Sequence, residues 1–368
     1  MDSTALPDPN PPQPAASATA TTAVSDPLNN PYTSLNSLCH DLSDLHTLAT
    51  RGAWKSLLDK IGHARSLNLL NKPHEHLTYL TFNVLALTKL RRNVDANQEL
   101  ETLLVDDPDF DSPQFYYQTY PHHYPNLKGN FVPFALRWLH AYLPYTLGHR
   151  IKSLDRFYTL LDFVRSKTIT DLWKKREILV LNTIISHHLS QKDFKLCLTL
   201  MNDLIRICGS DDPNVLSKIG YMKMQYGDVE GAKKAFSEVE GVVARSGNEI
   251  GLRNLVSRNK ALVYIVEKDY VSAVREYDEC IERDGMDMVA MNNKALCLMY
   301  SRDLSDAIKV LENGLERVPT VALNETLVVN LCSMYELAYV NHADIKRTLN
   351  SWIARVAPDD FDSSCTRT

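Results

Sequence analysis

The sequence predicts an all-α fold made of stacked helix hairpins. From about Pro31 onward, apolar residues recur at spacings of three and four, as they do on one face of a helix. No pair of alternating, strand-like runs is present. A short pattern also returns four times, at intervals of 35, 41 and 34 residues. A period of this size indicates a repeat architecture, in which each hairpin buries its apolar face against the next one.

Each copy of the pattern contains an aspartate between two helical stretches. These residues are Asp193, Asp228, Asp269 and Asp303. A carboxylate at this position can accept hydrogen bonds from the free N–H groups that open a helix, and it suits the positive end of the helix dipole. We therefore expect each aspartate to cap the second helix of its hairpin.

Small and large side chains keep fixed distances from each aspartate. A small residue stands eight positions before it in three copies, another small one follows it by four, and a large one follows by eight. The small residues are Gly220, Ala261 and Ala295 in first helices and Ala232, Ala273 and Ala307 in second helices, and the large ones include Phe236 and Tyr277. Small side chains let paired helices approach closely, and the large one fills the gap between repeats. Pro319 marks a repeat end.

This register is typical of tetratricopeptide repeats, whose period is about 34 residues. It predicts a tetratricopeptide-type right-handed α-solenoid of about seven or eight helix hairpins. The expected organisation is a disordered Pro/Ala/Ser/Thr-rich leader over 1–31, degenerate helical repeats over 32–105, a Tyr/Pro-rich structured connection over 106–133, the repeat array over 134–357 and a tail over 358–368.

The Tyr/Pro-rich connection interrupts the repeats. Its prolines exclude a continuous helix, and Tyr116, Tyr117, Tyr120 and Tyr124 are concentrated within it. Long structured connections and exposed tyrosines are typical of recognition sites, so these tyrosines are candidate partner-binding residues. The alternative is that they pack the connection onto neighbouring helices, and the sequence favours neither interpretation.

A row of asparagines is the second candidate for partner binding. Asn259 and Asn293, with Asn330 in the weaker last repeat, occupy equivalent positions in first helices. Because an amide both donates and accepts, such a row can read the backbone of an extended peptide. The same amides can instead join neighbouring helices by hydrogen bonds, and this structural interpretation is slightly favoured.

The asparagine row also bears on a carboxylate clamp of the kind that co-chaperones use. By register, the clamp positions are Arg258, Leu262, Asn293, Thr326 and Asn330. Two of these five positions suit that role, and the later cations are missing. A desolvated carboxylate binds poorly with so few cations, so we do not expect a clamp.

The composition favours a binding protein over an enzyme. A net charge of −5 without a basic patch argues against nucleic acid, and no apolar run is long enough for direct membrane insertion. Motifs for phosphate-binding loops, nucleophile elbows and zinc proteases are absent. The histidine pairs 74/76 and 122/123, expected in loops, lack a third ligand at fixed spacing. His187 and His188 are adjacent on a predicted helix, so their side chains point about 100° apart and do not readily bind one metal together. We therefore expect no catalytic residues, no cofactor and no metal.

Three stretches resemble one known family. They are FYYQTYPHHYPNLKGNFVPFALRWLHA from Phe115 to Ala141, LGHRIKSLDR from Leu147 to Arg156, and NLCSMYEL from Asn330 to Leu337 with the end running to Cys365. They are similar to the family of trafficking protein particle (TRAPP) complex subunit 12, and the resemblance covers residues 35–368.

The resemblance implies a non-catalytic scaffold subunit of a vesicle-tethering complex. In that family the subunit supports assembly or targeting of a Rab guanine-nucleotide-exchange complex in ER-to-Golgi and autophagy-related traffic. It implies other TRAPP subunits as partners, indirect association with a Rab GTPase and with membranes, and a cytoplasmic protein held peripherally at Golgi and early secretory membranes. The alternative is a stand-alone tetratricopeptide adaptor or co-chaperone that binds peptide tails.

Overall fold

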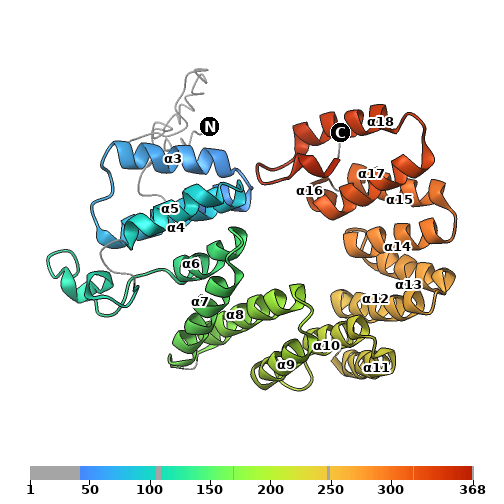
Figure 1. Cartoon of the computed structure of the whole chain (residues 1–368), viewed down its shortest axis with the longest axis horizontal. Helices are drawn as coiled ribbons and strands as arrows, with labels where there is room; N and C mark the ends of the chain where they lie inside the picture. Colours follow the sequence, from blue (N-terminus) through green and yellow to red (C-terminus); the bar gives the residue numbers. More distant parts are fainter. Residues whose placement is uncertain (1–41, 105–108, 169, 247–248, 318, 367–368) are drawn as a thin grey trace, which may run out of the picture. The chain divides into compact units, whose positions relative to one another are not determined.

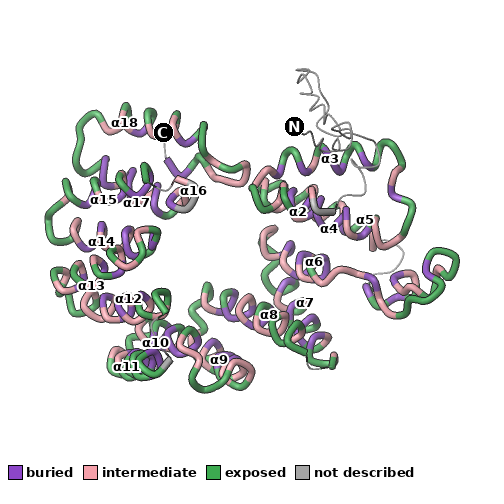
Figure 2. The backbone as a smooth tube through the Cα atoms, turned by 180° about the vertical axis from the view of Figure 1, so that it is seen from behind, coloured by how far each residue is buried: buried purple, intermediate pink, exposed green. Residues whose placement is uncertain are grey.

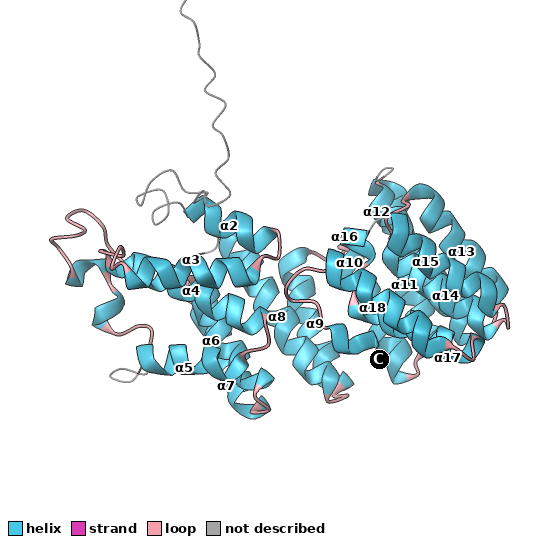
Figure 3. Cartoon of the chain, turned by 90° about the horizontal axis from the view of Figure 1, so that it is seen from above, coloured by secondary structure: helices cyan, strands magenta, loops and turns pink. Residues whose placement is uncertain are grey.

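The fold is described by a computed structural model over residues 42–104, 109–168, 170–246, 249–317 and 319–366. The expected leader over 1–31 lies outside these residues. Within the described part every regular element is helical, and the β-type pairing is confined to an isolated bridge between Tyr116 and Asn130 (Figure 3). The prediction of an all-α fold is confirmed.

The helices have the following bounds in chain order. They are α2 (Leu42–Thr50), α3 (Trp54–Ser66), α4 (Pro73–Lys89), α5 (Asn93–Leu103), the 3-10 turns η1 (Pro113–Phe115) and η2 (Tyr117–Thr119), α6 (Phe134–Thr146), α7 (Arg150–Arg165), α8 (Asp171–Ser190), α9 (Phe194–Cys208), α10 (Pro213–Tyr226), α11 (Val229–Ser246), α12 (Ile250–Val266), α13 (Tyr270–Arg283), α14 (Met288–Tyr300), α15 (Leu304–Arg317), α16 (Pro319–Ala322), α17 (Glu325–Ala338), α18 (His342–Val356) and η3 (Ser363–Thr366).

Consecutive helices of the described chain pair into eight hairpins. The pairs are α2/α3, α4/α5, α6/α7, α8/α9, α10/α11, α12/α13, α14/α15 and α17/α18, and the short α16 precedes the last pair. The hairpins follow one another in chain order (Figure 1). Helices that are neighbours in sequence are therefore also neighbours in space, which is the arrangement of a solenoid, and the expected seven or eight hairpins are confirmed.

Aspartate carboxylates open the second helix in four of these hairpins. Each accepts a hydrogen bond from a backbone N–H three residues ahead. The pairs are Asp193 with Leu196, Asp228 with Gly231, Asp269 with Ser272 and Asp303 with Asp306, at 2.9–3.3 Å. The carboxylates thus satisfy N–H groups that have no partner inside their own helix.

The residue just before the capping position has a left-handed backbone in seven hairpins. These residues are Gly52, Arg91, Gly148, Lys192, Gly227, Lys268 and Arg302, with φ between 60° and 96°. The turn register found at the four aspartates therefore extends to three earlier hairpins, where Ala53, Arg92 and His149 take the capping position. A left-handed backbone conformation is strained in any residue that carries a Cβ, and glycine adopts it without this strain.

The predicted small and large residues lie in the core. Ala261, Ala273 and Tyr277 are fully buried and belong to one cluster between α12, α13 and α14. Ala295 and Ala307 are fully buried in the next cluster along the chain. Figure 2 shows the buried residues along the faces where helices meet. Each hairpin thus contributes to a continuous core instead of enclosing one of its own.

Candidate interaction surfaces

The Tyr/Pro-rich connection folds back on itself between α5 and α6. The N–H of Tyr117 donates to the carbonyl of Gly129, and the N–H of Phe131 donates to the carbonyl of Phe115, both at 3.0 Å. Phe110, Phe115 and Phe131 are buried in a cluster with residues of α4 and α6. The connection is therefore a folded element with its own apolar core.

Three of the four tyrosines pack inside this element. Tyr124 is buried, its hydroxyl lies 2.5 Å from Nδ1 of His74, and its ring centroid lies 4.9 Å from that of Tyr117. The rings of Tyr117 and Tyr120 lie 5.3 Å and 6.2 Å from Phe131. Tyr116 is half-buried. These contacts favour the packing interpretation for Tyr117, Tyr120 and Tyr124.

Burial keeps the contact between Tyr124 and His74 uncharged. It raises the pKa of the Tyr124 hydroxyl and lowers the pKa of the His74 imidazole. Both groups are neutral at pH 7, and the imidazole and hydroxyl can then donate and accept between them. This pair fixes the connection to the start of α4.

The tip of the connection is its exposed part. Residues 121–123 and 125–128 are exposed around the buried Tyr124, and Leu127 is 53% exposed. An apolar side chain on an exposed loop tip is a more accessible partner contact than the tyrosines. Sequence reasoning selected the tyrosines and missed Leu127, although the run Pro125–Gly129 contains the turn-forming residues that mark a loop tip.

The asparagine row connects neighbouring helices. The Asn259 side-chain oxygen in α12 accepts from the Ser217 hydroxyl in α10 at 2.8 Å. Asn293 in α14 donates to the Tyr277 hydroxyl in α13 at 3.2 Å. Asn330 in α17 donates to Asn292 in α14 at 2.8 Å. These bonds support the structural interpretation of the row, which belongs to hairpins other than those that flank the tyrosines.

The clamp position Arg258 is already paired. Its guanidinium lies 3.1 Å from the buried carboxylate of Asp287, which also caps α14 by accepting from Ala290. The cation is therefore committed within the repeat and is not available to a terminal carboxylate of a partner.

The histidine pair on α8 is also occupied within the fold. Nδ1 of His187 donates to the carbonyl of Thr183 at 2.7 Å, and its Nε2 lies 3.4 Å from the Ser153 hydroxyl. Nε2 of His188 lies 3.0 Å from the Tyr158 hydroxyl. Within the described residues, no group of three or more side chains has an arrangement that suits a metal ion.

The segment after α18, together with the start of α17, contacts the first two hairpins. These contacts of the segment after α18 join residues at least 271 positions apart. Asp359 accepts from the backbone N–H and the ammonium group of Lys55, and its own N–H donates to the carbonyl of Gly52. Three further ion pairs are Lys89 with Asp360, Arg91 with Asp362 and Arg91 with Glu325. We call this set of contacts the seam.

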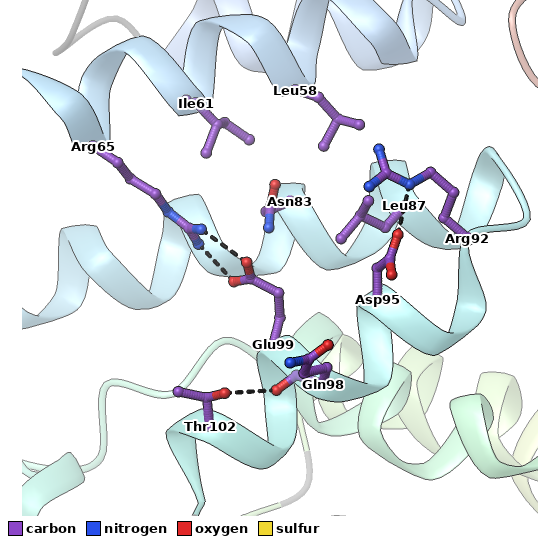
Figure 4. Close-up of a pocket in the computed structure, with 11 residues that line it drawn as sticks. Leu58, Ile61, Arg65, Asn83, Leu87, Arg92, Asp95, Gln98, Glu99 and Thr102 are labelled. Carbon is purple, nitrogen blue, oxygen red and sulfur yellow. Dashed lines mark hydrogen bonds and ion pairs between the residues drawn. The ribbon is translucent and has the colours of Figure 1, made fainter.

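A groove opens between α3 and α5, with α4 as its floor (Figure 4). Its first cavity has a volume of about 680 Å³, and Leu58, Ile61 and Leu87 provide apolar walls. Two ion pairs flank it. Arg65 reaches from α3 to the carboxylate of Glu99 on α5 through two bonds of 3.0 and 3.1 Å, and Arg92 binds Asp95 at 2.7 Å.

The groove continues on the other side of the Arg65–Glu99 ion pair. A second cavity of about 510 Å³ shares Arg65, Glu99 and Thr102 with the first and is floored by Leu77 and Leu80 of α4. The ion pair thus spans one groove at its middle.

No helix of the described residues is long and apolar enough to span a bilayer.

Comparison with known proteins finds relatives by sequence. No family model matches it. It is 30% identical over 347 residues to trafficking protein particle complex subunit 12 of Mus musculus, covering 85% of this chain and 43% of that protein. To the protein of the same name from Homo sapiens it is 29% identical over 330 residues, covering 83% and 44%. A solved tetratricopeptide repeat protein from Parabacteroides merdae is 13% identical and covers 79% of this chain and 96% of that one, with a TM-score of 0.44.

The eight stacked hairpins, the capping aspartates and the small–large register define a helical-repeat protein of the tetratricopeptide type. By sequence, the chain is a relative of trafficking protein particle complex subunit 12, which confirms the family resemblance. It spans less than half the length of these two relatives.

Proposed function

We propose that the chain is a non-catalytic scaffold subunit of the TRAPP vesicle-tethering complex. The observation that carries the proposal is the sequence similarity to trafficking protein particle complex subunit 12 over 85% of the chain. The fold supports it, because a solenoid offers a long surface for several partners at once. Most candidate residues of the two predicted sites form internal contacts. Tyr117, Tyr120 and Tyr124 pack within the connection, and Asn259 and Asn293 bond to neighbouring helices.

In this proposal the partners are other subunits of the complex. The chain supports assembly or targeting of a complex that promotes nucleotide exchange on a Rab GTPase in ER-to-Golgi and autophagy-related traffic, and the exchange chemistry belongs to other subunits. Association with the Rab and with Golgi or early secretory membranes is then indirect, through the complex, and the protein itself is cytoplasmic.

We further propose that the Tyr/Pro-rich connection presents its tip to a partner. The tyrosines hold the element in shape, and the exposed apolar side chain of Leu127 makes the contact. Tyr116, Tyr117, Tyr120 and Tyr124 then act on partner binding through the conformation of the tip.

Affinity purification from the native cells tests both statements. The tagged chain should recover the small core subunits of the complex together with other peripheral subunits. Leu127→Asp should reduce that recovery severalfold, whereas Leu67→Asp, which changes a similarly exposed leucine after α3, should leave it unchanged. Recovery of a chaperone or of one unrelated client, without any TRAPP subunit, would support the adaptor alternative instead.

A further inference from the structure

The groove between α3 and α5 has two features that the repeat fold does not require. The first is Gly62, which lies in the interior of α3 with no atom within 4 Å of the position that a Cβ would take. A glycine inside a helix destabilises it by about 1 kcal/mol relative to alanine. No contact with another described residue accounts for the glycine, and the open space beside it belongs to the groove.

The second feature is the amide of Asn83. This side chain is 7% exposed and lies on the floor of the groove, between the apolar side chains of Ile61 and Leu87 (Figure 4). Among the described residues, neither atom of its amide has a hydrogen-bond partner. The amide lines the open groove, where water can hydrogen-bond with it, so an occupant that displaces this water must itself both donate and accept.

The charge around the groove restricts the occupant. Arg65 is neutralised by Glu99, and Arg92 by Asp95, so the walls present no free charge of either sign. A phosphate group or a charged side chain would have to break one of these pairs to gain a partner. An uncharged occupant leaves both pairs intact.

We propose that this groove binds an extended, uncharged peptide segment of a partner protein. The segment lies along α4, its backbone exchanges hydrogen bonds with the amide of Asn83, and it passes close to the bare backbone at Gly62. Its apolar side chains lie on Leu58, Ile61 and Leu87.

An extended segment fits the groove better than a helix does. A helix satisfies its own backbone and would leave the Asn83 amide without a partner, whereas an extended strand has free N–H and carbonyl groups. A helix with side chains is also about 10 Å wide, and the Arg65–Glu99 ion pair crosses the groove. The floor from Leu77 to Leu87 is about 15 Å long, which about five extended residues span.

This proposal adds a binding site to the proposed scaffold role. It rests on that role only for the identity of the partner that supplies the segment. It is tested with the purified full-length chain alone, so it can fail while TRAPP subunits still co-purify with the chain, and the reverse can also occur.

The test selects phage that display seven random residues between neutral linkers. Phage are selected on the full chain and counter-selected on Gly62→Trp, whose ring fills the groove. Uncharged sequences should be enriched. The corresponding peptides, acetylated and amidated at their ends, should bind the full chain saturably in fluorescence anisotropy, and Gly62→Trp should weaken that binding at least tenfold.

Two variants separate the groove from general effects. Gly241→Trp changes another exposed glycine inside a helix with open space around it, and it should leave peptide binding unchanged. Asn83→Leu should weaken binding about tenfold, because it removes the amide, without lowering the melting temperature. The proposal is overturned if no sequence is enriched, if the enriched sequences are charged, or if they bind Gly62→Trp as tightly as the unchanged chain.

Discussion

Gly220 of α10 lies directly beneath the aromatic ring of Phe236 in α11. A Cβ at Gly220 would stand 2.4 Å from Cε1 and 2.7 Å from Cδ1 of that ring. Real Cβ atoms do not approach other atoms so closely, so the two helices can take their present separation only with glycine at this position.

Gly220→Ala is therefore expected to destabilise the protein by about 1–3 kcal/mol through overpacking. This sign opposes the usual gain of about 1 kcal/mol when alanine replaces a helical glycine. Urea unfolding would measure it, with Gly241→Ala as the control that should stabilise. The pair Gly220→Ala and Phe236→Leu should recover part of the loss, and a stabilising Gly220→Ala would show that the ring moves aside freely.

The left-handed turn residues predict opposite effects of glycine at equivalent positions. Gly227 has a φ of 96° and open space around its Cβ position, so Gly227→Ala should destabilise by about 1 kcal/mol through backbone strain alone. Lys268 has a φ of 64° with a side chain present, and Lys268→Gly should stabilise by up to about 1 kcal/mol. Thermal melting of the two variants measures both changes in stability. If both variants were stabilised, or both destabilised, the two positions would not share one turn geometry.

His140 in α6 predicts a loss of stability in mild acid. Burial, with the positive charges of Arg156, Lys152 and Arg137, lowers its pKa to about 3. In the unfolded chain this histidine has a pKa of about 6.5. Between about pH 6.5 and pH 3 the unfolded chain therefore binds a proton at this histidine, whereas the folded chain does not. Stability is complete above pH 6.5 and falls as the pH decreases toward 3.

The contribution of His140 to this loss of stability is measured by comparing the unchanged protein with a His140 variant. Between pH 7 and pH 5 it should amount to up to about 2 kcal/mol, and His140→Gln should lose less stability than the unchanged protein by that amount. Urea unfolding at the two pH values gives the comparison. His74 and His188, whose pKa values burial also lowers, contribute equally to both proteins. Parallel pH profiles would show that His140 titrates normally.

The tyrosines of the connection predict a stability effect. Tyr124→Phe removes the hydroxyl that contacts His74 and should destabilise by about 1 kcal/mol. The triple variant Tyr116→Ala, Tyr117→Ala and Tyr120→Ala should melt at a lower temperature, because two of the three rings pack on Phe131. A triple variant that melts normally but no longer recovers TRAPP subunits would restore the tyrosines as direct contacts.

The seam predicts a measurable coupling between distant residues. Lys89 and Asp360 lie 3.1 Å apart and are both partly exposed, so their coupling should be 0.2–1 kcal/mol, roughly that of other surface ion pairs. Lys89→Glu and Asp360→Lys should each destabilise, and the swapped pair should recover the loss in a double-mutant cycle. The coupling should shrink in salt at about 0.5 M, roughly threefold above physiological ionic strength, because the pair is screened. A coupling of zero at low salt would remove this pair from the seam.

The repeat itself was accessible from the sequence, and its contacts with distant residues were not. Asp193, Asp228, Asp269 and Asp303 recur in register, and local capping chemistry was enough to interpret them. The earlier hairpins share the turn geometry without the aspartate, and Gly52 and Gly148 were the available signal. The burial of Tyr124 depends on His74, fifty positions earlier, and no local pattern encodes that meeting. The groove at Gly62 and Asn83 arises from three helices together, and neither residue belongs to the repeat register.

The seam changes how the array is expected to unfold. In an open solenoid the two terminal repeats have one neighbour each, so they fray first and amide hydrogen exchange is fastest there. Here the hairpins α2/α3 and α4/α5 also contact the segment after α18. The terminal repeats thereby acquire a second neighbour. A perturbation of residues 359–362 is transmitted to the first two hairpins without crossing the repeats between them. Cooperativity in this chain is then better described by a closed series of couplings than by a line with two ends.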